Sequence, residues 1–103
     1  MDECGFIVMT PLGFRVVCTA EDWERIAGRK LPPLRGRLRE VVETLSNPDE
    51  IRRSVSDPEV TLFHLWSGRR WVCAVIRRSH PESRLITAYP ADKIKQGALL
   101  WRK

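Results

Sequence analysis

The sequence lacks long apolar runs. Its longest apolar stretches read FIVM, VTLFHLW and WVCAVI, well short of the roughly 20 residues that a membrane-spanning helix needs. The N-terminus also lacks a basic segment followed by an apolar stretch of signal-peptide type. We therefore expect a soluble, cytoplasmic protein that has no membrane partner.

Cysteine and histidine are scarce. The three cysteines, Cys4, Cys18 and Cys73, are odd in number and show neither CxxC spacing nor a Cys/His pattern typical of zinc sites. We expect buried free thiols rather than disulfides, and we expect no metal ion or organic cofactor. The two histidines, His64 and His80, are the only imidazoles that can titrate near neutral pH.

Lysine is scarce as well, whereas arginine is abundant. Fourteen of the eighteen basic residues are arginine, and the formal net charge is +5. A planar guanidinium can bind phosphate through two parallel hydrogen bonds, so this composition favours a polyanionic or acidic partner. Because thirteen acidic residues are also present, a surface covered with salt bridges is the competing interpretation.

The first half of the chain predicts a hairpin and two helices. With 103 residues and 43% apolar content, the chain can form one core, so we expect a single domain over residues 1–103. FIVM and FRVVC flank the turn TPLG and predict an N-terminal β-hairpin. Thr19 can cap a short helix that Gly28 ends. Apolar residues at helical spacing from Leu34 to Leu45 predict a second helix.

From residue 50 onward the pattern changes to strands. EIRRSV, VTLFHLW, WVCAVIRR and RLITAY are rich in β-branched and aromatic residues, and the breaks between them are short. Short connections require antiparallel neighbours, so these segments predict a four-stranded antiparallel meander sheet. With the hairpin and the two helices packed on that sheet, the predicted fold class is α+β, and the other face of the sheet is available for binding.

Several segments resemble a known family. The order of elements, with NPDEIRRS, LFH, WVCAVIRR and above all LITAYPADKIKQGALLW, resembles small bacterial and phage-associated proteins of the barnase/EndoU/colicin/RelE-like nuclease fold. The resemblance covers about residues 10–101, and its most specific part is the TAYP motif. It implies a metal-independent ribonuclease, in many members a toxin, and it implies RNA and an acidic antitoxin-like protein as partners.

Cleavage of this kind uses the 2′-hydroxyl of RNA as the nucleophile. It needs a base for the hydroxyl proton, a cation for the phosphorane and a proton donor. The resemblance implies that Arg52 or Arg53 is the cation and that Thr87 positions or donates to the phosphate. Lys93 or Lys95 would then contact the RNA backbone.

The residues themselves narrow these alternatives. Arg52 and Arg53 point to opposite faces of their strand, and we favour Arg52 because it lies on the more polar side. Relatives often carry a His-Pro pair where this chain has Leu31, so His64 becomes the candidate base. A half-buried structural histidine is the competing interpretation for His64, and His80 lies in the turn SHPES.

Further residues complete the predicted RNA-binding set. Strand alternation places Leu85, Thr87 and Tyr89 on one face, where the two hydroxyls can donate to a phosphoryl oxygen or simply pack. Arg77 lies at the end of a strand beside a turn. There its side chain can either contact a phosphate of the RNA or simply keep the turn soluble, and the sequence favours neither role. Tryptophans can stack bases or fill the core, and the arginine pair of SGRR is expected to solvate its turn.

Three functions are therefore open. In the first, the protein is a ribonuclease with Arg52, His64 and Thr87 as catalytic residues. In the second, it is a catalytically degenerate module of the same fold that binds RNA or an acidic protein. In the third, it is a structural or interaction protein. Because a leucine cannot transfer protons, Leu31 favours the second and third functions over the first.

Overall fold

The structure is a computed structural model that describes residues 5–27 and 37–103. Several sequence-based predictions fall outside these residues. They are the buried state of Cys4, the helix end at Gly28, the start of the second helix at Leu34, and the role of Leu31.

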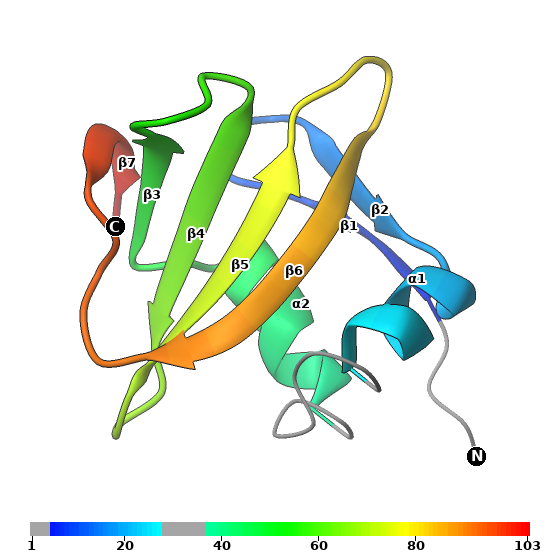
Figure 1. Ribbon diagram of the computed structural model, residues 1–103, viewed down its shortest axis with the longest axis horizontal. Helices are drawn as coiled ribbons and strands as arrows, with labels where there is room; N and C mark the ends of the chain where they lie inside the picture. The colour runs from blue at the N-terminus through cyan, green and yellow to red at the C-terminus, as the bar shows by residue number, and fades with distance from the viewer. Residues whose placement is uncertain (1–4, 28–36) are drawn as a thin grey trace.

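One mixed sheet of seven strands forms the body of the protein (Figure 1). The spatial order of the strands is β1-β2-β6-β5-β4-β3-β7, and all neighbours are antiparallel except β2 and β6. The strands are β1 (Phe6–Met9), β2 (Arg15–Cys18), β3 (Glu50–Ser54), β4 (Val60–Trp66), β5 (Trp71–Arg77), β6 (Ser83–Ala91) and β7 (Gly97–Arg102).

The predicted fold of a four-stranded antiparallel meander carrying two helices is wrong. The strands β3, β4, β5 and β6 are consecutive neighbours, as expected, but the sheet continues beyond β6 at one end and beyond β3 at the other. On one side β2 joins β6 in parallel, with Val16 opposite Ser83, and brings β1 with it. On the other side β7 pairs with β3, with Trp101 opposite Ile51. Both pairings join segments far apart in the chain, and short turns carry no information about such pairings.

Two short helices complete the fold, α1 (Ala20–Arg25) and α2 (Leu38–Ser46). Thr19 caps α1, as predicted: its Oγ1 accepts from the Asp22 backbone N–H at 3.0 Å, and Asp22 Oδ2 accepts from the Thr19 N–H at 3.4 Å. The Asp22 carboxylate also pairs with Arg84 of β6 at 2.8 Å and with Arg25 at 2.8 Å. The hydrogen bond from Arg84 holds the pKa of Asp22 well below its usual range and ties α1 to the sheet.

The core lies between α2 and one face of the sheet. α2 packs against β1, β4 and β5 and lies behind the sheet in Figure 1. Val41 and Leu45 of this helix are fully buried, and they belong to one cluster with Phe63, Ala74 and Ala88, which are cross-strand neighbours on β4, β5 and β6. Among the described residues, no helix is long and apolar enough to cross a membrane.

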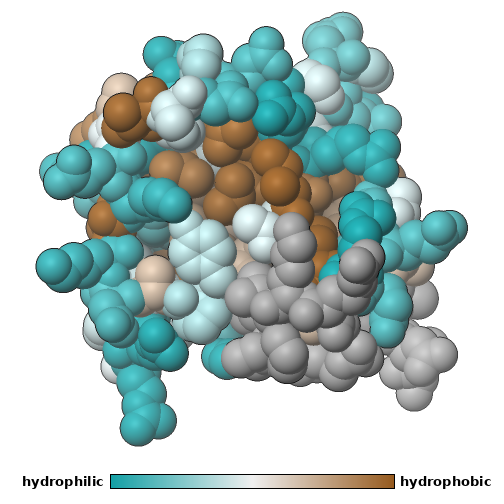
Figure 2. All heavy atoms as spheres, in the orientation of Figure 1, coloured by the Kyte–Doolittle hydropathy of each residue, from teal (hydrophilic) through white to brown (hydrophobic). Residues whose placement is uncertain are grey.

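No described helix covers the opposite face of the sheet, which is called here the open face (Figure 1). Figure 2 shows this face, with an apolar area over the central strands and hydrophilic side chains around it. A bulge in β6 places Thr87 opposite Val75 and Leu85 opposite Ile76. The predicted shared face of Leu85 and Thr87 is therefore wrong, because the extra residue, Ile86, turns Leu85 into the core and is itself 41% exposed.

Candidate functional site

A row of polar side chains crosses the open face. Arg102 of β7 lies opposite Glu50 of β3, Glu50 lies opposite His64 of β4, His64 lies opposite Cys73 of β5, and Cys73 lies opposite Tyr89 of β6. Directly opposed residues in neighbouring strands have side chains within contact distance. Five strands thus bring together a guanidinium, a carboxylate, an imidazole, a thiol and a phenol from residues as far apart in the chain as Glu50 and Arg102.

Glu50 holds the arginines at one end of this row. Arg52 contacts Glu50 Oε1 through Nη2 at 2.7 Å and through Nε at 2.9 Å, and Arg52 Nη1 donates to the Gly97 carbonyl oxygen at 3.0 Å. Arg102 Nε lies 3.5 Å from the other carboxylate oxygen. The side chain of Arg52 is only 24% exposed. Arg52 therefore braces β3 against β7, and each of its three guanidinium nitrogens contacts the protein itself.

His64 is enclosed at the centre of the row, with none of its surface exposed. Its Nε2 accepts a hydrogen bond from the Lys95 backbone N–H at 3.2 Å, so the neutral ring carries its proton on Nδ1. Among the described residues, that Nδ1 has no hydrogen-bond partner. Burial lowers the pKa of His64 to about 4; Glu50 opposes this shift and Arg52 adds to it. This geometry favours the structural interpretation of His64 over the role of an accessible base.

The segment between β6 and β7 closes over the other end of the row. The ammonium of Lys95 lies 5.9 Å from the centre of the Tyr89 ring, while its backbone N–H contacts His64. Burial raises the pKa of Tyr89 above its ordinary value, and burial raises the pKa of Cys73 to about 11. Both groups are therefore neutral at physiological pH, and the charge at this end of the row belongs to Lys95.

The three predicted catalytic residues do not converge on one point. Arg52 and Thr87 lie in the same cross-strand row, on β3 and β6, with Leu62 and Val75 between them. Three strand spacings separate their backbones by about 14 Å, which is too far for both side chains to hold one phosphate. His64 lies between them but is buried.

The remaining predicted residues are spread over the molecule. Arg53 lies on the opposite face from Arg52. Arg77 lies at the far end of β5, where it pairs with Asp57 at 3.1 Å and Glu59 at 3.6 Å. Lys93 is exposed in the segment that also carries Lys95. Of the predicted RNA-binding residues, Tyr89 therefore lies in the polar row, and Lys95 contacts the row at His64 and Tyr89.

The β4–β5 hairpin brings together two of the tryptophans for which the sequence leaves base stacking and core packing open. Trp66 and Trp71 lie opposite each other at its base, with ring centres 5.3 Å apart, and Trp66 is 47% exposed. The Trp71 ring also meets the His64 ring edge-on at 6.5 Å. Gly68, at φ 97°, allows the tight turn between them, which the Ser67 hydroxyl closes by donating to the Arg70 carbonyl oxygen at 2.6 Å.

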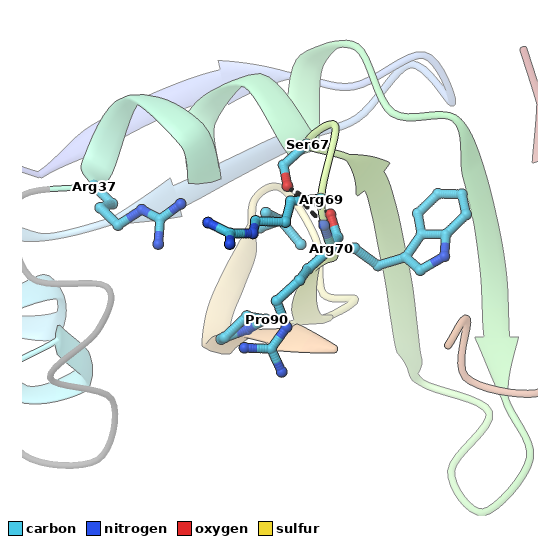
Figure 3. A pocket seen from close by; sticks show the side chains of 7 residues that line it. Arg37, Ser67, Arg69, Arg70 and Pro90 are labelled. Atoms are coloured by element: carbon cyan, nitrogen blue, oxygen red, sulfur yellow. Dashed lines mark hydrogen bonds between the residues drawn. The ribbon is translucent and has the colours of Figure 1, made fainter. Parts of the chain in front are cut away.

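A pocket of about 400 Å³ lies beside this hairpin (Figure 3). Residues from α2, the hairpin and β6 line it: Arg37, Ser67, Arg69, Arg70, Trp71, Val72 and Pro90. The signal in the sequence was the run WSGRRW, in which two arginines stand between two tryptophans. Arg37 could not have been assigned to this pocket from the sequence, because it lies at the N-cap of α2, thirty positions before the hairpin (67 − 37 = 30).

Cys18 and Cys73 are buried free thiols. Within residues 5–27 and 37–103, no group of three or more His, Cys, Asp or Glu side chains is placed to share a metal ion. Comparisons with protein-family models, curated proteins and solved structures find no match to this chain.

Proposed function

We propose that this protein binds single-stranded RNA and does not cut it. The observation that carries the proposal is the Trp66–Trp71 pair on the open face, which lies next to basic residues of two segments. Arg70 belongs to the hairpin itself, and Lys93 and Lys95 belong to the β6–β7 segment, which Arg70 contacts through Asp92. The Lys95 backbone N–H contacts His64, and the His64 ring contacts the Trp71 ring. These two contacts keep the β6–β7 segment next to the aromatic rings.

This arrangement suits unpaired bases. Aromatic side chains that present their rings on a sheet can stack bases, and each such contact contributes about 1–3 kcal/mol. The neighbouring cations can hold the phosphates that connect those bases. A duplex keeps its bases stacked on one another, so its interior bases cannot use the tryptophans. The choice of RNA over DNA rests on the resemblance to a ribonuclease fold.

Binding suits the geometry better than cleavage does. Arg52 and Thr87 are about 14 Å apart, Arg52 is held by Glu50 and Gly97, and His64 has no exposed surface. Among the described residues, Arg52, His64 and Thr87 therefore do not converge on one phosphate at the open face.

The test is fluorescence anisotropy of a labelled single-stranded RNA in EDTA over a range of salt concentrations. Three phosphate contacts, from Arg70, Lys93 and Lys95, predict a slope of log K against log salt of about −2. The substitution Trp66→Ala should weaken binding roughly 5- to 150-fold. Arg15→Gln is the matched charge control, because Arg15 is exposed on β2, away from the hairpin.

Three outcomes would contradict the proposal. The first is affinity that does not depend on salt, and the second is unchanged affinity in Trp66→Ala. The third is the appearance of fragments with 2′,3′-cyclic phosphate ends, which would establish the ribonuclease instead. An acidic peptide that displaces the RNA at equal concentration would make an acidic protein the preferred ligand.

A further inference from the structure

Three arginines from two distant parts of the chain meet in the pocket beside the hairpin. Arg37 comes from the N-cap of α2, and Arg69 and Arg70 come from the turn between β4 and β5. Figure 3 shows the guanidinium groups of Arg37 and Arg69 pointing toward each other, while Arg70 runs beside Pro90. Like charges that face each other are destabilising unless an anion lies between them.

The acidic partners of these arginines leave them partly free. Arg37 pairs with Glu40 at 2.6 Å, and both side chains are about two-fifths exposed, at 42% and 40%. Arg70 Nε lies 3.4 Å from Asp92, whose side chain is 85% exposed. Within the described part of the chain, Arg69 forms no hydrogen bond or ion pair. Three arginines against these two carboxylates leave the pocket with an excess of positive charge.

The surroundings of the pocket differ on its two sides. A second hollow of about 470 Å³ shares Arg37 and Arg69 with the pocket, and it is also lined by Trp66, Glu40 and Glu43. Glu40 is paired with Arg37, so Glu43 is the carboxylate that repels a phosphate chain continuing in that direction. On the other side the pocket is lined by Trp71, one of the two tryptophans proposed to stack bases. A nucleic acid strand whose bases lie on the tryptophans can therefore place a phosphate in the pocket.

We propose that this pocket binds the terminal phosphate of an RNA strand whose bases lie on the tryptophans. This inference rests on the proposed RNA binding and adds a preference for the end of the strand. A terminal phosphomonoester carries a charge of about −1.5 to −2 at neutral pH, whereas an internal phosphodiester carries about −1. Two facing guanidinium groups match the terminal group in charge, and each can donate two parallel hydrogen bonds to it.

The experiment compares RNAs of one sequence that carry a 5′-phosphate, a 3′-phosphate or hydroxyl groups at both ends. Binding is measured with the wild-type chain at pH 7.5, where the terminal phosphate is mostly a dianion. One of the two phosphorylated RNAs should bind about tenfold more tightly than the hydroxyl-ended RNA. The end that gains affinity identifies the direction of the strand.

Variants then assign the preference to the pocket. Arg69→Gln and Arg37→Gln should each remove most of the tenfold advantage, while the affinity for the hydroxyl-ended RNA changes less than about threefold. Arg15→Gln should keep the whole advantage. Because Arg69 has no partner within the described residues, Arg69→Gln is not expected to disturb folding, and circular dichroism checks this. If it does, Arg37→Gln and the wild-type comparison still decide the question.

The outcomes separate the two proposals. Equal affinity for all three RNAs would overturn the terminal-phosphate site and leave RNA binding intact. An advantage that survives both arginine substitutions would place the phosphate elsewhere and would also overturn the site. If none of the three RNAs binds, the proposed function fails together with the inference that rests on it.

Discussion

The buried histidine predicts a pH dependence of stability. His64 is enclosed between Glu50, Cys73 and the backbone of Lys95, and its pKa falls from 6.5 to about 4 on folding. Between these two values the unfolded chain binds a proton at this position and the folded chain does not. Stability from this group is therefore complete above about pH 6.5, decreases as the pH falls toward 4, and then stays constant. Protonation of the ring would also place a hydrogen on Nε2. Because Nε2 could then no longer accept the hydrogen bond from the Lys95 N–H, this contact would be lost.

The size of the effect follows from the two pKa values. A difference of 2.5 units corresponds to a maximum of about 3 kcal/mol, at 1.36 kcal/mol per unit. Between pH 7 and pH 5 the linkage relation gives a loss of about 2 kcal/mol, because the titration is incomplete at both ends. Asp22 and Asp57 have lowered pKa values, so they titrate below this window and do not contribute to the slope within it.

Urea denaturation, followed by tryptophan fluorescence at several values between pH 5 and pH 7, measures this loss. The matched variant is His64→Gln, which keeps an acceptor for Lys95 but cannot titrate. It should lose the pH slope, whereas His80→Gln should keep it, because His80 is exposed in a turn. A slope in His64→Gln equal to that of the wild type would refute the reasoning and place the titrating group elsewhere.

Two further predictions concern packing. Gly97→Ala should lower the free energy of unfolding by about 1–3 kcal/mol, because its Cβ would collide with a backbone carbonyl of β3; an unchanged urea midpoint would contradict this. Cys18 and Cys73 are 1% exposed, and burial raises the pKa of their thiols to about 12 and about 11. In a Cys4→Ser variant, a thiol reagent at pH 7 should therefore react only after urea unfolds the chain, and fast labelling of the native protein would disprove the buried position.

Local patterns predicted local structure well. The Thr19 cap depends on residues three positions apart, and the order of β3, β4, β5 and β6 depends on turns of a few residues. The alternation of side chains along a strand also correctly predicted that Arg52 and Arg53 lie on opposite faces of the sheet. These features were readable because the residues that determine them are close neighbours in the chain.

Pairings between distant segments were not predictable in the same way. The sequence did not indicate that β2 would join β6 in parallel or that β7 would return to β3. It also did not reveal the bulge at Ile86, which reverses the face of Leu85. A strand pattern records which side chains alternate, but not which partner the strand chooses or where its register shifts.

The sequence by itself determined the charges, the aromatic side chains and the facing of Arg52 and His64 on their strands. Only the tertiary structure decided that Arg52 and Thr87 lie three strands apart, that His64 is buried, and that Arg37 faces Arg69 across a pocket. The physical reason is that a binding site depends on distances between elements. Those distances follow from strand order and helix packing, which are set by burial of the whole core rather than by any one segment.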